Sequence, residues 1–107
     1  MKIKMSMHTR NNAAFAEAIY TGDSVIVLPG GRVSEKFASH INGGDYALKF
    51  RNDPKYVDSN RNIIKQCEFH SPSIAAQFVN GMSTNGYRKW RVGDVTLGEY
   101  LKSEGLR

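Results

Sequence analysis

Residues 24–28 (Ser-Val-Ile-Val-Leu) are the strongest indication of a β-sheet in this chain. They are apolar on both faces of an extended backbone and rich in β-branched side chains, which is typical of a strand with neighbours on both sides. Residues 2–8 alternate apolar and polar side chains and predict a half-buried strand. Residues 14–20 fit either a strand or a helix behind Asn12, and the turn-forming Thr-Gly-Asp at 21–23 favours the strand.

The middle of the chain gives weaker signals. Pro-Gly-Gly at residues 29–31 predicts a turn. Ser34 is then a suitable N-cap for a short helix over residues 35–41, ended by Asn-Gly-Gly at 42–44. Residues 45–62 alternate in part, as a strand does, but they also permit a short helix interrupted at a proline. Both interpretations stay open for that stretch.

A helix with a defined beginning and end is predicted between Ser71 and Gly81. Ser71 is a good N-cap because its hydroxyl accepts a hydrogen bond from a free backbone N–H. Pro72 suits the first helical position, where its missing N–H costs nothing. Gly81 suits the left-handed residue that follows a helix.

The C-terminal segment carries further local signals. Asn-Gly at residues 85–86 predicts a tight turn, and residues 87–92 predict a strand. After a second turn, Thr96 and the glutamate three residues later form a capping box that starts a last helix over residues 97–103. The chain of 107 residues therefore predicts one α+β domain, a small antiparallel or mixed sheet packed by two or three short helices.

Charge and cysteine content bear on the partners and the compartment. Fifteen Lys and Arg against ten Asp and Glu give a net charge of +5, which favours polyanions but is also an ordinary charge for solubility. The single cysteine, Cys67, excludes an intramolecular disulfide and fits a reducing compartment. No apolar run approaches the ~20 residues of a membrane helix, and the N-terminus lacks a signal-peptide pattern. We therefore expect a cytoplasmic protein without a membrane partner.

A motif over residues 69–97 resembles a known family. It reads F-H-S-P-S-I-A-A, then G-x-S-x-N-G, then Trp90, then Thr-Leu at 96–97. It is similar to the domain of unknown function at the C-terminus of some GIY-YIG nucleases, which is related to the RAMA domain (restriction enzyme and adenine methylase associated). His70 and Arg91 stand where that family usually has serine and lysine, and neither breaks the pattern. The resemblance implies an α+β fold and a role in recognising nucleic acid, including modified DNA.

The predicted C-terminal strand contains the main candidate binding residues. Alternation places Tyr87, Lys89 and Arg91 on one face, where the ring offers a stacking plane and the cations offer phosphate contacts. Arg88 is a further candidate, although alternation places it with Trp90, whose indole is more simply explained as core. An ordinary solvated strand face explains the cations equally well.

Four further residues are candidates for contacts with nucleic acid. Ser71 and Ser73 lie where a helix N-terminus presents free N–H groups, although capping explains them more simply. Asn85 precedes a glycine whose backbone a ligand could approach, and a turn is the simpler interpretation. Arg32 follows Pro-Gly-Gly, which could form a phosphate nest but lacks the spacing of a phosphate-binding loop.

The sequence gives little support to catalysis, a metal or a cofactor. Cys67 has only His70 as a nearby base, and the three histidines have no spacing for a zinc site. We therefore expect a non-enzymatic module that binds nucleic acid, with DNA the first candidate. The alternative is a small protein of a phage or mobile element that binds and inhibits a host defence effector of the restriction or CRISPR type.

Overall fold

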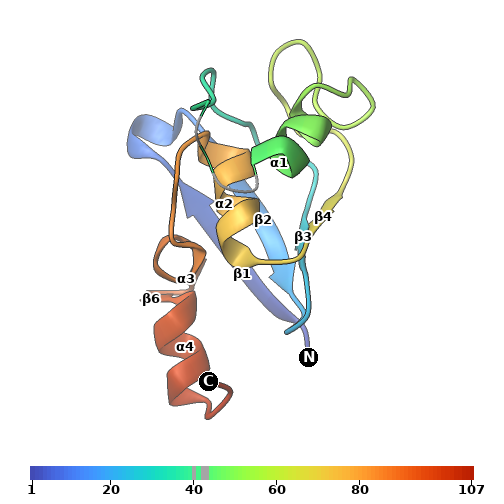
Figure 1. Ribbon diagram of the computed structural model, residues 1–107. Helices are drawn as coiled ribbons and strands as arrows, with labels where there is room; N and C mark the ends of the chain where they lie inside the picture. Colours follow the sequence, from blue (N-terminus) through green and yellow to red (C-terminus); the bar gives the residue numbers. More distant parts are fainter. Residues whose placement is uncertain (40, 42–43) are drawn as a thin grey trace.

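The computed structural model describes residues 1–39, 41 and 44–107 and folds them into one antiparallel sheet with short helices (Figure 1). The sheet has the strand order β4-β3-β2-β1-β5-β6. Its strands are β1 (Ile3–His8), β2 (Phe15–Tyr20), β3 (Val25–Val27), β4 (Cys67–Phe69), β5 (Arg91–Val92) and β6 (Val95–Thr96). The helices are α1 (Gly44–Arg51), α2 (Pro72–Asn80), α3 (Gly86–Lys89) and α4 (Leu97–Ser103), with a 3-10 turn, η1 (Arg10–Asn12). The α+β class is confirmed, and within the ranges given no helix has both the length and the apolar character needed to span a membrane.

The sheet has a buried face and an open face. The buried face of β1 and β2 is formed by alternate apolar side chains: Ile3, Met5, Met7, Ala16, Ala18 and Tyr20. α2 packs against β2, β3 and β4 (Figure 1). The open face carries the side chains in between: Lys4, Ser6, His8, Phe15, Glu17 and Ile19. Both strand predictions are confirmed, and the helical alternative for residues 14–20 is excluded.

β3 is an inner strand, as the sequence predicts. It pairs with β2 on one side and with β4 on the other. Val25 and Val27 are fully buried, and Ile26, on the opposite face, is half-buried. Apolar side chains on both faces therefore match a strand that is covered on one side by helices and flanked on both edges by other strands.

The helix predicted over residues 35–41 is wrong for the part that the structure describes. Residues 35–39 and 41 contain no helix, and His40 lies outside the described residues. The segment instead bonds to the end of α2, where the Ala38 N–H donates to the Gly81 carbonyl at 2.8 Å. These contacts with another element outweigh the local capping signal on which the prediction depended.

A half-buried arginine fixes the same segment. Arg51, at the end of α1, donates from its guanidinium to the carbonyls of Ser34 and Phe78, the latter at 2.7 Å. The guanidinium also lies over the Phe37 ring, 5.0 Å from its centroid. Burial, and then the charge of Arg61, lowers the pKa of Arg51 to about 10. One side chain therefore connects α1, the segment that follows β3, and α2.

The ambiguous stretch over residues 45–62 begins as a helix. α1 starts at Gly44, so the glycine that was expected to end a helix is the first residue of one. Tyr46 and Phe50 are four residues apart, and their rings meet edge to face at 5.5 Å. Positions i and i+4 share a helix face, which explains why this apolar spacing suits a helix as well as a strand.

Both capped helices form as predicted. Ser71 Oγ accepts from the Ile74 N–H at 3.1 Å, and Gly81 follows α2 with a φ of +73°. In α4, Thr96 and Glu99 exchange the two hydrogen bonds of a capping box, each 3.1 Å long. Hydrogen bonds from Thr96 to the Glu99 carboxylate lower the pKa of that carboxyl group.

The strand predicted over residues 87–92 is wrong for most of its length. Residues Gly86–Lys89 form α3, and only Arg91–Val92 are extended, as β5. Asn85 Oδ1 accepts from the Tyr87 N–H at 3.0 Å, so Asn85 caps a helical turn rather than forming a hairpin. Strand alternation therefore does not assign the candidate binding residues to faces.

Candidate functional site

The residues of the family-like motif hold α3 against the beginning of α2. Trp90 is fully buried, and its indole N–H donates to the Pro72 carbonyl at 2.9 Å. The Gly86 N–H donates to Ser73 Oγ at 2.9 Å. A Cβ on Gly86 would overlap with the Pro72 carbonyl, so only glycine permits so close an approach. We call this set of contacts the α2–α3 junction.

Ser71 and Ser73 are occupied by the protein's own backbone. Ser71 Oγ caps α2, and Ser73 Oγ belongs to the α2–α3 junction. Asn85 also serves as a cap, for α3, but its side chain is exposed. Structural roles in capping and turns therefore explain the contacts of all three residues. Only Asn85, whose side chain is exposed, remains a candidate for binding a ligand.

Tyr87 does not present an open ring. It is half-buried against the core, and the Arg107 guanidinium lies 3.7 Å from its ring centroid. Burial first, and then the neighbouring Tyr87, raises the pKa of Tyr20. The prediction that strand alternation exposes the Tyr87 ring is wrong, because α3 turns the ring toward the core and the C-terminal arginine covers it.

The cations near Tyr87 do converge on one surface hollow. His8, Arg88, Lys89 and Arg91 line a space of about 370 Å³, which we call the basic hollow. Arg91 reaches it from β5, directly opposite Ser6 of β1, and its guanidinium donates to the Asp94 carbonyl at 2.6 Å. The helical turn of α3 brings Arg88 to the same side, although strand alternation had placed it on the opposite face.

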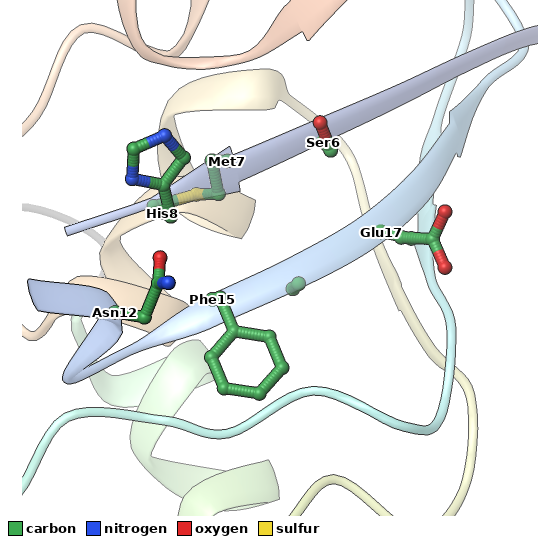
Figure 2. Close-up of a pocket in the computed structure, with 7 residues that line it drawn as sticks. Ser6, Met7, His8, Asn12, Phe15 and Glu17 are labelled. Carbon is green, nitrogen blue, oxygen red and sulfur yellow. The ribbon is translucent and has the colours of Figure 1, made fainter.

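A second hollow adjoins the first on the open face of the sheet. It measures about 280 Å³ and is lined by Ser6, Met7, His8, Asn12, Phe15, Ala16 and Glu17 (Figure 2). We call it the aromatic hollow. Figure 2 shows the His8 imidazole and the Phe15 ring on either side of the Asn12 amide. Because His8 lines both spaces, the aromatic and basic hollows are neighbours on either side of this residue.

Arg32 lies next to the aromatic hollow. Its backbone exchanges two hydrogen bonds with Phe15, of 3.0 and 2.9 Å, so the two residues are directly opposite one another. Residues paired in this way place their side chains on the same face, and both side chains are exposed. Gly31 allows the approach, because a Cβ there would overlap with the Phe15 carbonyl. The predicted residue Arg32 thus extends the row formed by His8 and Phe15.

A third hollow continues from the basic hollow toward the end of α2. It measures about 340 Å³, and we call it the polar hollow. Arg88 and Lys89 line both spaces. The remaining lining residues are Asn80, Met82, Ser83, Thr84 and Asn85. The three hollows therefore follow one another across the surface, from Phe15 past the cations to Asn85, and we call this series the track.

The charges along this track are mostly positive. In the part of the chain that the structure describes, the one ion pair is Lys4–Glu17, 3.9 Å apart on the open face. Arg88, Lys89 and Arg91 thus form no ion pair within 4.0 Å among the described residues, although the hydrogen bonds from Thr96, and then the charge of Arg91, lower the pKa of Glu99. Glu17 is the acidic residue in the lining of the three hollows, and Lys4 partly offsets its charge.

His8, Asn12 and Phe15 are the site residues that the sequence did not reveal. The alternation of residues 2–8 places His8 on the polar face, but nothing in it distinguishes a binding residue from a solvated one. For Phe15, both faces of residues 14–20 are apolar enough to be the buried one. Pairing with β1, in which Met5 lies opposite Ala18, decides which face is buried, and that pairing is not local in sequence.

Cys67 lies away from this track and has an unreactive environment. It is fully buried, its Sγ donates to the Lys65 carbonyl at 3.4 Å, and burial raises the pKa of the thiol to about 12. The thiol is therefore uncharged at neutral pH, whereas the thiolate is the nucleophilic form. Among the described residues, no three His, Cys, Asp or Glu side chains are grouped closely enough to hold a metal ion.

We expect an aromatic disulfide reagent to leave the single thiol of the native protein unmodified at neutral pH. In concentrated guanidinium the same thiol should react to one equivalent per chain, because unfolding removes the burial. The absorbance of the released thiolate measures both reactions. Rapid labelling of the native protein would contradict the burial of Cys67.

The comparison with protein families gives a match over residues 7–101 to the family described as Domain of unknown function (DUF4357). The chain belongs to the DUF4357 family. In this DUF4357 domain the matched residues include the motif at 69–97, all of the α2–α3 junction, and every lining residue of the three hollows except Ser6. No curated protein and no solved structure matches the chain.

Proposed function

We propose that this DUF4357 domain is a non-enzymatic module that binds nucleic acid along the track of the three hollows. The observation that carries the proposal is the convergence of Arg88, Lys89 and Arg91 on one hollow, without an ion pair among the described residues. Such cations attract phosphates and release counterions on binding. Arg32, at the other end of the row with Phe15, adds a further cation to the same face.

DNA is the first ligand to test. The motif over residues 69–97 resembles the domain found at the C-terminus of some GIY-YIG nucleases, which is related in turn to the RAMA domain. This resemblance favours DNA, including modified DNA, as the partner. The net charge of +5 favours a polyanion in general. In this proposal the motif itself maintains the fold, because its residues form the α2–α3 junction, and the binding residues lie beside it.

The test compares two triple variants that remove the same charge. One is Arg88→Ala, Lys89→Ala and Arg91→Ala in the basic hollow. The control is Lys49→Ala, Lys55→Ala and Lys102→Ala, whose side chains are exposed and line none of the three hollows. Fluorescence anisotropy of labelled DNA, repeated over a range of salt concentrations, gives the affinity and its salt dependence.

The basic-hollow variant should lose at least about tenfold in affinity at low salt, and its salt slope should fall by about 2 to 3 as the contribution of three phosphate contacts disappears. The control should remain close to the parent protein. Equal losses of affinity in both variants would mean that net charge alone explains binding, and would reject the track as the binding site. Undetectable binding of DNA and RNA by the parent protein at low salt would reject the proposal, and a salt-insensitive complex with a host protein would then favour the inhibitor alternative.

A further inference from the structure

Phe15 is exposed in a way that the fold does not require. Of the five phenylalanines, it alone is exposed, with 37% of its surface open to solvent. Its neighbours in sequence, Ala14 before β2 and Ala16 within it, are buried, so the strand is anchored without the ring. The ring lies on the open face of the sheet and borders the aromatic hollow (Figure 2), and no helix among the described residues covers it.

The loop beside this ring is held in a fixed shape. Thr9 accepts from the Ala14 N–H through its hydroxyl at 2.9 Å, and the Thr9 N–H donates to the Ala14 carbonyl at 2.8 Å. Asn12 has a φ of +53°, a left-handed conformation that asparagine tolerates better than most residues. The Asn12 and Ser6 side chains form no hydrogen bond with the residues that the structure describes, so both are available to a ligand in the aromatic hollow.

The aromatic hollow has the dimensions and groups of a subsite for one planar ring. Its volume, about 280 Å³, is just below the range of about 300 to 1,000 Å³ for pockets that enclose whole small molecules. It offers one apolar face, from Phe15, and hydrogen-bonding groups at its rim, from Asn12, His8 and Ser6. A nucleobase has the same combination of a flat π-face and polar edges.

The arrangement of the two hollows bears on whether the nucleic acid would be single-stranded or a duplex. A base in the aromatic hollow would lie next to a backbone in the basic hollow, because one imidazole borders both spaces. In a duplex the faces of the bases are covered by neighbouring base pairs, so an aromatic side chain can stack on a base only after base pairs are unstacked or a base is extruded, which costs free energy. An unpaired strand offers its base faces without that cost, and we therefore favour it as the ligand.

We infer that the domain binds a single strand, with one unstacked base on the Phe15 ring and the adjoining phosphates in the basic hollow. The inference rests on the proposed nucleic-acid function and deepens it. It assigns the base contact to the open sheet face of β1 and β2 and the phosphate contacts to α3 and β5.

The test compares a labelled single-stranded DNA with the duplex of the same sequence. For the parent protein, the single strand should bind at least about tenfold more tightly. Phe15→Ala should weaken single-strand binding by between about fivefold and a hundredfold, which is the range for loss of one aromatic stacking contact. Duplex binding should change by less than about twofold, because only phosphate contacts are expected to hold it.

Three further variants keep the test independent of folding defects. Phe15→Leu retains an apolar side chain but lacks the π-face, and it should lose most of the single-strand affinity that Phe15→Ala loses. Phe15→Trp should retain binding, and its fluorescence, after subtraction of the signal from buried Trp90, should be quenched by a stacked base. Leu106→Ala removes another exposed apolar side chain, outside all three hollows, and should behave as the parent protein does.

The outcomes separate the inference from the function on which it rests. Equal affinity for duplex and single strand, or an equal loss of both in Phe15→Ala, would overturn the inference while leaving the nucleic-acid function intact. Unchanged single-strand affinity in Phe15→Leu would show an apolar contact without stacking and would also overturn it. If the parent protein binds neither form at low salt, the proposed function itself is rejected.

Discussion

Replacing Trp90 with alanine is expected to lower the free energy of unfolding by about 3 to 5 kcal/mol, the usual cost of deleting a large buried aromatic side chain. Trp90 is fully buried, and its indole N–H is bonded to the Pro72 carbonyl. Truncation therefore leaves a cavity and removes that hydrogen bond at once. Because Trp90 is the single tryptophan, denaturation should be followed by circular dichroism rather than by fluorescence.

Trp90→Phe separates the two contributions. It keeps a ring in the core but removes the indole N–H, so the Pro72 carbonyl loses a donor; the expected cost is about 1 to 3 kcal/mol. The cost of Trp90→Ala should be clearly larger than that of Trp90→Phe. Equal costs would mean that the hydrogen bond, and not the packing of the indole, dominates the α2–α3 junction.

Gly86→Ala should be nearly as disruptive, although it adds a single methyl group. We expect a loss of at least about 3 kcal/mol, at the upper end of the cost of overpacking, because the methyl would meet the backbone of Pro72 and Ser73 rather than a side chain that can move away. Denaturation with urea, followed by circular dichroism, measures the change in the free energy of unfolding.

Gly98→Ala is the matched control for Gly86→Ala. Gly98 lies in α4, and a Cβ there would sit 3.3 Å from the Tyr87 carbonyl, a contact that a shift of a few tenths of an ångström relieves. Alanine also favours the helix more than glycine does. The control should change stability by less than about 1 kcal/mol. A Gly86→Ala protein as stable as the control would show that α3 does not depend on its close approach to α2.

The elements that could be predicted from the sequence are those whose signals lie within a few residues. Ser71 bonds to Ile74, and Thr96 bonds to Glu99, so each cap involves residues three positions apart. The alternation of β1 is equally local, because it reflects the period of one strand. In each case the competing conformation lacks a comparable local interaction.

The elements that could not be predicted depend on contacts between distant residues. Asn85-Gly86 has the composition of a hairpin turn, but the Gly86 N–H bonds to Ser73, thirteen positions away, and a helical turn results. Ser34 is a residue type that favours the N-cap position, but the Arg51 guanidinium donates a hydrogen bond to its carbonyl, and no helix follows it among the described residues. The register of β2 with β1 decides which face of β2 is buried. It therefore also decides that Phe15 is exposed.

If the domain binds nucleic acid as proposed, the α2–α3 junction has a consequence for how its ligand preference can change. The motif residues Ser73, Gly86 and Trp90 are committed to architecture, whereas Phe15 and His8 contribute nothing to that architecture and lie outside the motif. Substitutions on the strand surface are therefore free to retune recognition while the scaffold stays constant. Functional divergence should therefore be sought on the exposed side of β1 and β2, and not in the motif at residues 69–97.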